Sequence, residues 1–224
     1  MLTRQKEPLL RIVCLSDTHG LHAQIQVPDG DILVHAGDLT KRGGLGELQE
    51  AADWLRSLPH SHKVVIAGNH DFCLEQQPEK ARELLHGLTY LEDESCHCAG
   101  LKIYGSPWQP WFHDWAFNLR RGEPLRKVWA QIPEDADIVI THGPPQGILD
   151  RCFDGREVGC QDLFERLEVV RPRLHVFGHI HEAYGQVQVG ETLYVNASSC
   201  TLQYRAVQTP IVVDLHAPPE DLKG

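Results

Sequence analysis

Five short apolar runs, each followed at once by a small polar motif, constrain the fold of this chain more than any other feature. The runs are rich in β-branched residues, which is typical of buried strands, and they cover residues 12–15, 32–34, 64–66, 138–140 and 174–177. The motifs that follow them are Asp17-Thr18-His19, Gly37-Asp38, Gly68-Asn69-His70-Asp71, His142-Gly143 and Gly178-His179-Ile180-His181. In open α/β sheets, ligands bind at the carboxyl ends of the strands. The sequence therefore predicts that five strand ends converge on one site.

Helical patterns alternate with these runs. Leucine and alanine recur at steps of three and four residues from Leu45 to Leu58, which predicts an amphipathic helix ended by Pro59. Pro78 is placed to open a second helix, and apolar helical faces recur around 125–132 and 163–170. After residue 185 the pattern is that of strands, at 186–189, 193–195 and 211–213. This order predicts an α/β fold with two sheets of mixed direction and helices outside. With no linker or repeat in view, we expect one domain over residues 1–224.

Composition narrows the classes of function. A net charge of −10 argues against an extended nucleic-acid surface, which would be basic. No apolar run approaches the roughly 20 residues that cross a bilayer, and residues 1–8 show no apolar secretory region. Seven scattered cysteines without a CxxC pair indicate reduced thiols and favour a cytoplasmic location, with Cys96-His97-Cys98 as ordinary strand sequence. The oligomeric state is not determined by these features.

The residue types in the motifs indicate a site for two divalent ions. Such a pair needs a bridging ligand and several terminal ones, and a carboxylate can bridge. The sequence offers the carboxylates of Asp17 and Asp38, the amide of Asn69, and the imidazoles of His19, His142, His179 and His181. A mixed oxygen and nitrogen set suits Mn²⁺, which we expect first, or Fe or Zn. The positive charge of two such ions exceeds the negative charge of two carboxylates. The site would therefore be a positive pocket for a phosphate group in an otherwise acidic chain.

The five motifs together, in this order, resemble those of the calcineurin-like metallophosphoesterase superfamily. Three further segments resemble its metallophosphoesterase-domain-containing (MPPED) branch: Ser106-Pro107-Trp108-Gln109-Pro110, Trp115-Ala116-Phe117-Asn118-Leu119 and Thr141-His142-Gly143-Pro144-Pro145. The resemblance covers about residues 12–214. It implies a four-layer α/β/β/α sandwich of two mixed sheets flanked by helices, two bound metal ions, and hydrolysis of phosphate esters.

The resemblance also implies roles for individual residues. Asp17, His19 and His181 would hold the first ion, Asn69, His142 and His179 the second, and Asp38 would bridge them. A hydroxide between the ions would attack phosphorus in line. His70 would be a general acid for the leaving oxygen, or a donor to a phosphate oxygen. For Asp71, a role as acceptor for a ligand imidazole and a role in the turn both remain open.

The MPPED resemblance implies a phosphodiesterase for small or cyclic nucleotide-type diesters. An aromatic loop at 105–119 offers Trp108, Trp111 and Trp115 as substrate-binding residues, because bases stack on aromatic rings. The same rings could instead form a local hydrophobic cluster. Two other functions remain open, a phosphomonoesterase or protein phosphatase and a metal-stabilised binding scaffold without catalysis. The partner expected in the enzymatic case is a small phosphoester.

Overall fold

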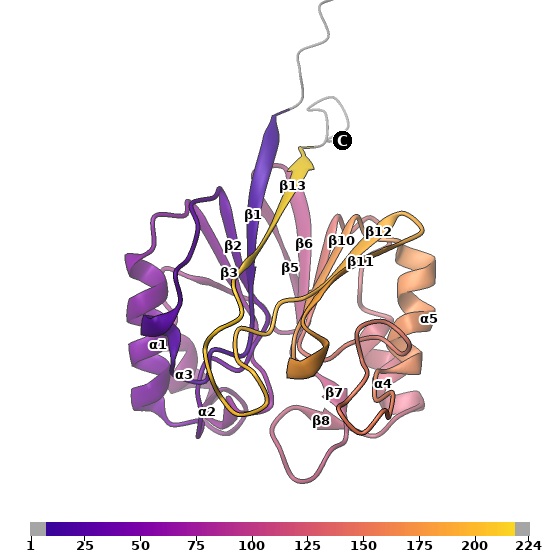
Figure 1. Ribbon diagram of the computed structural model, residues 1–224, viewed down its shortest axis with the longest axis horizontal. Helices are drawn as coiled ribbons and strands as arrows, with labels where there is room; N and C mark the ends of the chain where they lie inside the picture. The colour runs from indigo at the N-terminus through magenta and orange to yellow at the C-terminus, as the bar shows by residue number, and fades with distance from the viewer. Residues whose placement is uncertain (1–7, 218–224) are drawn as a thin grey trace, which may run out of the picture.

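The computed structural model describes residues 8–217 and contains two β-sheets packed face to face between helices (Figure 1). The first sheet has the strand order β13-β1-β2-β3-β4. Its strands are β1 (Leu9–Leu15), β2 (Ile32–His35), β3 (His62–Val65), β4 (Thr89–Tyr90) and β13 (Ile211–His216). β1 to β4 run parallel, and β13 pairs antiparallel with β1 at the edge.

The second sheet has the order β11-β12-β10-β9-β6-β5. Its strands are β5 (Glu94–Cys98), β6 (Leu101–Ser106), β9 (Ile138–Thr141), β10 (Leu174–Phe177), β11 (Gly185–Val189) and β12 (Thr192–Asn196). The four central strands run parallel, and the edge strands β5 and β11 are antiparallel to their neighbours. All strands expected to carry ligands are thus parallel members of one sheet or the other, so their carboxyl ends gather at one edge of each sheet.

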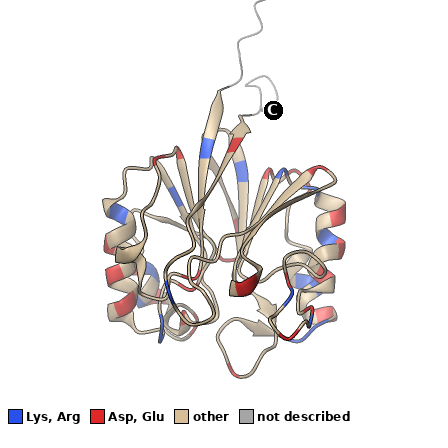
Figure 2. Ribbon diagram, in the orientation of Figure 1, with Lys and Arg blue, Asp and Glu red and all other residues tan. Residues whose placement is uncertain are grey.

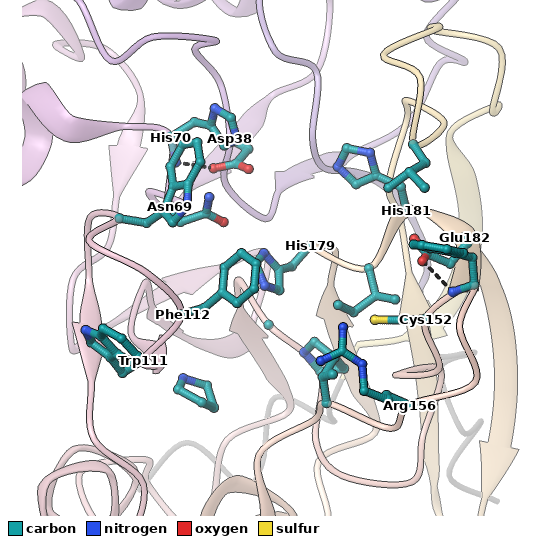
Figure 3. Close-up of a pocket in the computed structure, with 18 of the residues that line it drawn as sticks. Asp38, Asn69, His70, Trp111, Phe112, Cys152, Arg156, His179, His181 and Glu182 are labelled. Atoms are coloured by element: carbon teal, nitrogen blue, oxygen red, sulfur yellow. Dashed lines mark hydrogen bonds between the residues drawn. The ribbon is translucent and has the colours of Figure 1, made fainter.

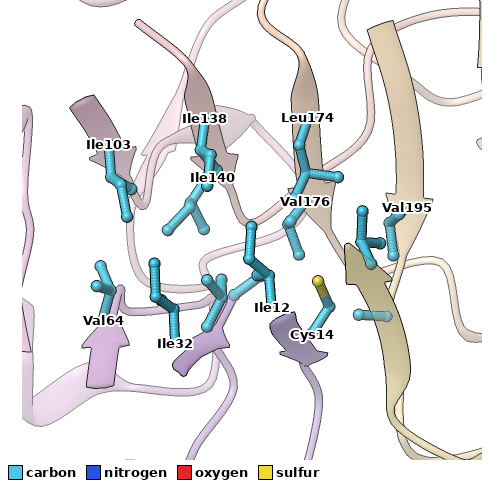
Figure 4. Close-up of a cluster of buried hydrophobic side chains, with 14 of the residues drawn as sticks. Ile12, Cys14, Ile32, Val64, Ile103, Ile138, Ile140, Leu174, Val176 and Val195 are labelled. Carbon is cyan, nitrogen blue, oxygen red and sulfur yellow. The ribbon is translucent and has the colours of Figure 1, made fainter. Parts of the chain in front are cut away.

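Strand residues alternate between two buried layers, which explains why the runs are apolar throughout. In β1, Ile12 and Cys14 face the cluster between the sheets, whereas Val13 and Leu15 face the helices. The layer between the sheets is aliphatic, with Ile32, Ile140 and Val176 among its members (Figure 4). A one-residue shift in register would move every side chain of such a strand into the opposite buried layer. The register is therefore strongly specified, and so is the position of each strand end.

Helices cover the outer face of each sheet. The helices are α1 (Leu45–Ser57), α2 (Phe72–Gln76) and α3 (Pro78–Leu84) on the first sheet, and α4 (Glu123–Trp129) and α5 (Gln161–Val170) on the second. α1 buries Leu48, Ala52 and Leu55 on one face, and most charged residues of the helices lie on the outside of the sandwich (Figure 2). The predicted α/β architecture of two mixed sheets with flanking helices is confirmed.

Some local features differ from the expectation. The short helix α2 was not predicted, and the aromatic loop contains a small parallel pair, β7 (Gln109–Pro110) with β8 (Asn118–Leu119). Two 3-10 turns also lie near ligand motifs, η1 (His22–Gln24) after the first of them and η2 (His181–Ala183) at the end of the last. Cys96 and Cys98 lie in strand β5, as expected. The polar segment expected at residues 1–8 lies outside the described residues except for Pro8.

Within residues 8–217, no helix has the length and apolar character needed to cross a bilayer.

Candidate metal centre

The seven expected ligands lie together at the carboxyl ends of the two sheets. Asp17 and His19 follow β1, Asp38 follows β2 and Asn69 follows β3, while His142 follows β9 and His179 and His181 follow β10. All are buried except His179, which is partly exposed. Figure 3 shows Asp38 and Asn69 on one side of a cavity, with His179 and His181 reaching it from the other sheet. The packing of the two sheets therefore assembles the site.

The first group of ligand atoms comprises Asp17, His19 and His181. The Nε2 atoms of His19 and His181 lie 3.2 Å apart, and Asp17 Oδ1 is 3.3 Å from His181 Nε2. His181 Nδ1 donates to the carbonyl oxygen of Thr201 at 3.1 Å, which directs Nε2 to the shared point. Two ring nitrogens and a carboxylate oxygen thus converge on one point.

The second group is built in the same way around Asp38, Asn69 and His142. His142 Nε2 is 2.9 Å from Asn69 Oδ1 and 3.4 Å from Asp38 Oδ2, and its Nδ1 donates to the Ala36 carbonyl oxygen at 2.9 Å. His179 lies beside this group, with its ring centroid 5.1 Å from that of His142. The ligand atoms that converge on Asp38 come from Asp17 and His142 and from His19 and His70.

Asp38 lies between the two groups. Its Oδ2 is 3.7 Å from His19 Nε2 and 3.4 Å from His142 Nε2. Its Oδ1 accepts the backbone N–H of His70 at 2.7 Å. Asp38 therefore faces both groups with one oxygen, and it is the residue that would hold an ion in either group.

The two carboxylates favour positive charge on the imidazoles beside them. Burial disfavours the imidazolium of His142, but Asp38 outweighs this effect and raises the pKa of His142 to about 9. Burial acts against His181 in the same way, and Asp17 raises its pKa to about 9. Without a metal, protons thus supply the positive charge at the points where ligand atoms converge. Divalent ions fit the same points, because the deprotonated atoms form an oxygen and nitrogen donor set.

Four of the ligand residues have a left-handed backbone, which non-glycine residues rarely adopt. The φ angles are 52° at Asp17, 44° at His19, 56° at Asp38 and 68° at His179. Such conformations cost roughly 1–3 kcal/mol each and persist where the surrounding structure imposes them. The strand ends turn sharply here, and the turn directs each side chain into the space between the sheets.

Glycines precede three of the ligands, and at all three the backbone approaches another ligand closely: a Cβ atom on Gly37 would lie 2.7 Å from His142 Nδ1. A Cβ atom on Gly68 would collide with Asp38 Oδ1, and one on Gly178 would collide with Asp17 Oδ2. Each of these glycines therefore makes room for a ligand side chain of another motif. This close approach accounts for the Gly-Asn and Gly-His pairs seen in the sequence.

His70 is fixed on two sides and faces the cavity on the third. Its Nδ1 donates to the Lys41 carbonyl oxygen at 2.8 Å. Its ring packs against Trp115, with centroids 4.3 Å apart, and against His19 at 4.6 Å. Since His70 lines the cavity, its Nε2 is the nitrogen available to a substrate.

Asp71 stabilises the turn, which is one of the two roles considered for it, and among the described residues it does not accept a hydrogen bond from a ligand imidazole. Its carboxylate accepts the backbone N–H groups of Gly68, Leu39 and Thr40, and the hydroxyl of Thr40 at 2.7 Å. Burial and the charge of Asp38 raise the pKa of Asp71 to about 6. The carboxylate thus holds the ligand loops after β2 and β3 together, and within residues 8–217 it has no imidazole as hydrogen-bond partner.

The three tryptophans of the aromatic loop have different surroundings. Trp111 and Trp115 line the cavity, and Trp111 is 60% exposed. Trp108 is absent from the cavity wall: its Nε1 donates to Asp93 Oδ2 at 2.8 Å, and its ring packs against Phe117. Trp108 therefore belongs to the hydrophobic packing, whereas Trp111 and Trp115 border the space beside the ligands.

The structure adds cavity residues that carry no sequence motif. The cavity has a volume of about 410 Å³, and its wall includes Phe112, Phe153, Arg156 and Tyr204. The backbone N–H of Phe153 donates to Glu182 at 2.8 Å, which ties the loop after residue 150 to the ligand motif of the second sheet (Figure 3). These residues lie on irregular loops, where no periodic pattern signals which side chains face a site.

The sandwich and its paired clusters of carboxylate, amide and imidazole define the class of metal-dependent phosphoester hydrolases. The family described as Calcineurin-like phosphoesterase matches residues 10–183, and the chain belongs to this family. The chain is also 46% identical to human Metallophosphoesterase domain-containing protein 1 over 93% of its own length and 72% of that protein. The family membership and the MPPED resemblance predicted from the sequence are thus confirmed.

The chain is also similar to other proteins. A UPF0046 protein of Caenorhabditis elegans is 40% identical, over 97% of this chain and 85% of its own. Among solved structures, TT1561 of Thermus thermophilus superposes with a TM-score of 0.59 at 14% identity, covering 94% of this chain and all of that one. At this level of identity the structural likeness shows the fold alone.

Proposed function

We propose that the protein is a two-metal phosphodiesterase acting on small diesters of the nucleotide type. The observation that carries the proposal is the cavity that continues from the candidate metal centre to an aromatic wall. A diester has a second organic group on the phosphate, and the cavity offers space for that group beside Trp111 and Phe112. Pockets of roughly 300–1,000 Å³ hold small ligands.

The residues of the site would have different roles in diester hydrolysis. The chemistry that a two-ion centre supplies is activation of water as the nucleophile and neutralisation of charge on the phosphoryl oxygens. The seven ligands described above would hold the ions, with Mn²⁺ as the expected metal. Asp38 links the two ligand groups, because its Oδ2 faces both.

His70 would act on the leaving oxygen. Its Nδ1–H bond to the Lys41 carbonyl leaves Nε2 to face the cavity. A protonated Nε2 can donate to an alkoxide as the ester bond breaks, which is the role of a general acid. The Trp115 ring on one face of the imidazole restricts its rotation.

The proposal is tested with two aryl substrates on one preparation. Purified protein loaded with Mn²⁺ is assayed on bis-p-nitrophenyl phosphate, a diester, and p-nitrophenyl phosphate, a monoester, with metal content measured alongside. We expect a higher kcat/KM on the diester and no turnover after treatment with a chelator.

A higher kcat/KM on the monoester would favour the phosphomonoesterase alternative and overturn the proposal. No turnover on either ester, with two ions bound per chain, would favour the binding scaffold instead. Asp38→Asn is the control for traces of a contaminating phosphatase, because a contaminant would copurify unchanged.

A further inference from the structure

A short segment after β12 crosses from the second sheet to the first, directly behind the first ligand group. The backbone N–H of Ala197 donates to Phe177 in the second sheet at 2.7 Å, and that of Ser199 donates to Ser16 at the end of β1 at 2.8 Å. Ser198 pairs with Ser16 in a parallel bridge between these contacts. The segment thus joins the strand ends of the two sheets, and Ser198 is completely buried in it.

The Ser198 side chain contacts the carboxylate of Asp17. Its hydroxyl donates to Asp17 Oδ2 at 2.8 Å. The backbone N–H of His179 also donates to the carboxylate, at 3.0 Å to Oδ2 and 3.2 Å to Oδ1. Oδ2 therefore receives the shorter bonds from the protein, and Oδ1 faces His181 Nε2 at 3.3 Å.

Asn196 holds Ser198 in this orientation. Asn196 Oδ1 accepts the backbone N–H of Ser198 at 3.2 Å, and its Nδ2 donates to the Ile180 carbonyl oxygen at 2.9 Å. The Ser198 hydroxyl also lies 2.9 Å from Asn196 Oδ1. Since a hydroxyl has one proton and both neighbours accept, the charged and nearer carboxylate of Asp17 is the stronger acceptor.

We propose that Ser198 is a positioning residue that fixes which oxygen Asp17 presents to the first ion. The Ser198 hydroxyl adds to the His179 N–H a second donor on Oδ2 and so opposes rotation of the carboxylate, which keeps Oδ1 turned towards His19 and His181. This inference rests on the proposed function only in that it requires the protein to bind metal ions. Groups that orient ligands in this way typically change metal affinity by about 10–100-fold when removed.

Ser199 provides a matched control for Ser198. It is the next residue, it is also buried, and its hydroxyl has no hydrogen-bond partner within residues 8–217. Ser199→Ala removes the same atom as Ser198→Ala from the same segment, without touching Asp17. A loss caused by disturbed packing would affect both variants, whereas a loss of carboxylate orientation affects only Ser198→Ala.

The test is a titration of metal-free protein with Mn²⁺, followed by electron paramagnetic resonance and calorimetry. We expect Ser198→Ala to weaken one of two binding steps by about 10–100-fold and to leave the other close to the wild-type value. Ser199→Ala should bind both ions as the wild type does. Ser198→Cys keeps a heavy atom at the γ position but has only a weak donor, so it should show the same selective loss, and it replaces Ser198→Ala if that variant does not fold.

Wild-type affinity at both steps in Ser198→Ala or Ser198→Cys would overturn the inference, as would an equal loss in Ser199→Ala. The titration also separates this inference from the proposed function. If the wild type binds two ions but prefers the monoester, the diesterase proposal fails and the Ser198 result stands. If the wild type cleaves diesters and the Ser198 variants bind metal normally, the inference fails alone.

Discussion

The two sheets contribute different chemistry to the same centre. The strand ends of the first sheet supply the oxygen ligands, Asp17, Asp38 and Asn69, together with His19. Those of the second supply only imidazoles, His142, His179 and His181. Both formal negative charges of the centre thus come from one half of the molecule. Neither half alone carries a complete ligand set for an ion, so metal binding depends on the packing between the sheets.

The contacts between the halves follow the same division. Asp17 of the first sheet is paired with His181 of the second at 3.3 Å, and Asp38 is paired with His142 at 3.4 Å. The aliphatic layer between the sheets sets the spacing at which these pairs meet. In the metal-free protein, protons on the imidazoles link the halves, and bound ions would replace those protons.

The largest effect should come from removing charge from the first half. Asp38→Asn keeps the shape and the tolerance for a left-handed backbone but removes the charge between the two ligand groups. We expect both ions to bind more weakly and kcat/KM on bis-p-nitrophenyl phosphate to fall by roughly 10³-fold or more, since a metal ion contributes several kcal/mol to such reactions. His179→Asn, a change in the half that supplies imidazoles, should weaken one ion only. Metal content and kcat/KM are measured for both variants. Equal losses of bound metal in Asp38→Asn and His179→Asn would contradict the different roles assigned to the two halves.

The next effect concerns the proton donor, which only the first half supplies. His70→Ala should lower kcat by about 10²–10⁴-fold on a cyclic nucleotide or alkyl diester, because an alkoxide leaves poorly without a proton. The loss on a p-nitrophenyl ester should be much smaller, since p-nitrophenolate departs unprotonated. Both substrates are measured on one preparation with its metal content known. An equal loss on both substrates would show that His70 binds phosphate oxygens or positions Asn69.

A smaller effect should distinguish the two tryptophans of the cavity. Trp111 is exposed, so Trp111→Ala should raise KM for nucleotide diesters by roughly 5–100-fold, given about 1–3 kcal/mol for stacking on a base, and leave KM for aryl diesters less changed. Trp115 packs against His70, so Trp115→Ala should lower kcat on alkyl diesters, and Trp115→Phe should restore much of it. If both alanine variants lose only thermal stability, the rings serve packing and the stacking role is excluded.

The smallest effect is a pH dependence of stability in the metal-free protein. The pKa values of His142 and His181 are about 9 in the folded state, above the unfolded value of about 6.5. Their contribution to the free energy of unfolding is complete below pH 6.5 and is lost as the pH rises through 9. The melting temperature of chelator-treated protein should therefore fall between pH 7 and 9, by about 2–4 °C for each kcal/mol lost.

The metal-loaded protein should not show this decline, because imidazoles that bind metal are already deprotonated. His35 and His175 do not interfere in this window, since burial lowers the pKa of each to about 3 and both stay neutral above pH 7. A parallel decline in loaded and metal-free protein would mean that the two ion pairs between the sheets do not link the halves.

The sequence predicts the sheets and the position of the site because both depend on strong, local patterns. Each strand that leads to a ligand motif carries an apolar run that is buried on both faces, and β1 shows why: Val13 and Cys14 are both buried, in different layers. Helix α2 has five residues and β7 has two, so neither is long enough for a periodic pattern to form. Their existence follows from packing between distant segments.

The residues around the ligands were less predictable for the same reason. Trp108, Trp111 and Trp115 are alike in sequence, but their surroundings differ because the loop follows no regular period. Ser198 and Tyr204 lie in a turn-rich segment far along the chain, and their contacts with the ligands arise only when the two sheets meet. Motif spacing indicates the donor atoms of a site, whereas the supporting contacts depend on the three-dimensional structure.

The left-handed backbone at four ligand positions has a consequence for how this site could be lost. Aspartate and histidine adopt this conformation more often than most other residues, but only glycine adopts it without steric cost. Once selection for metal binding is relaxed, glycine at these positions would relieve strain and stabilise the fold. Catalysis and stability therefore favour different residues at the same positions. We expect inactive descendants of such a protein to carry glycine or asparagine there and to unfold at higher temperature than their active ancestors.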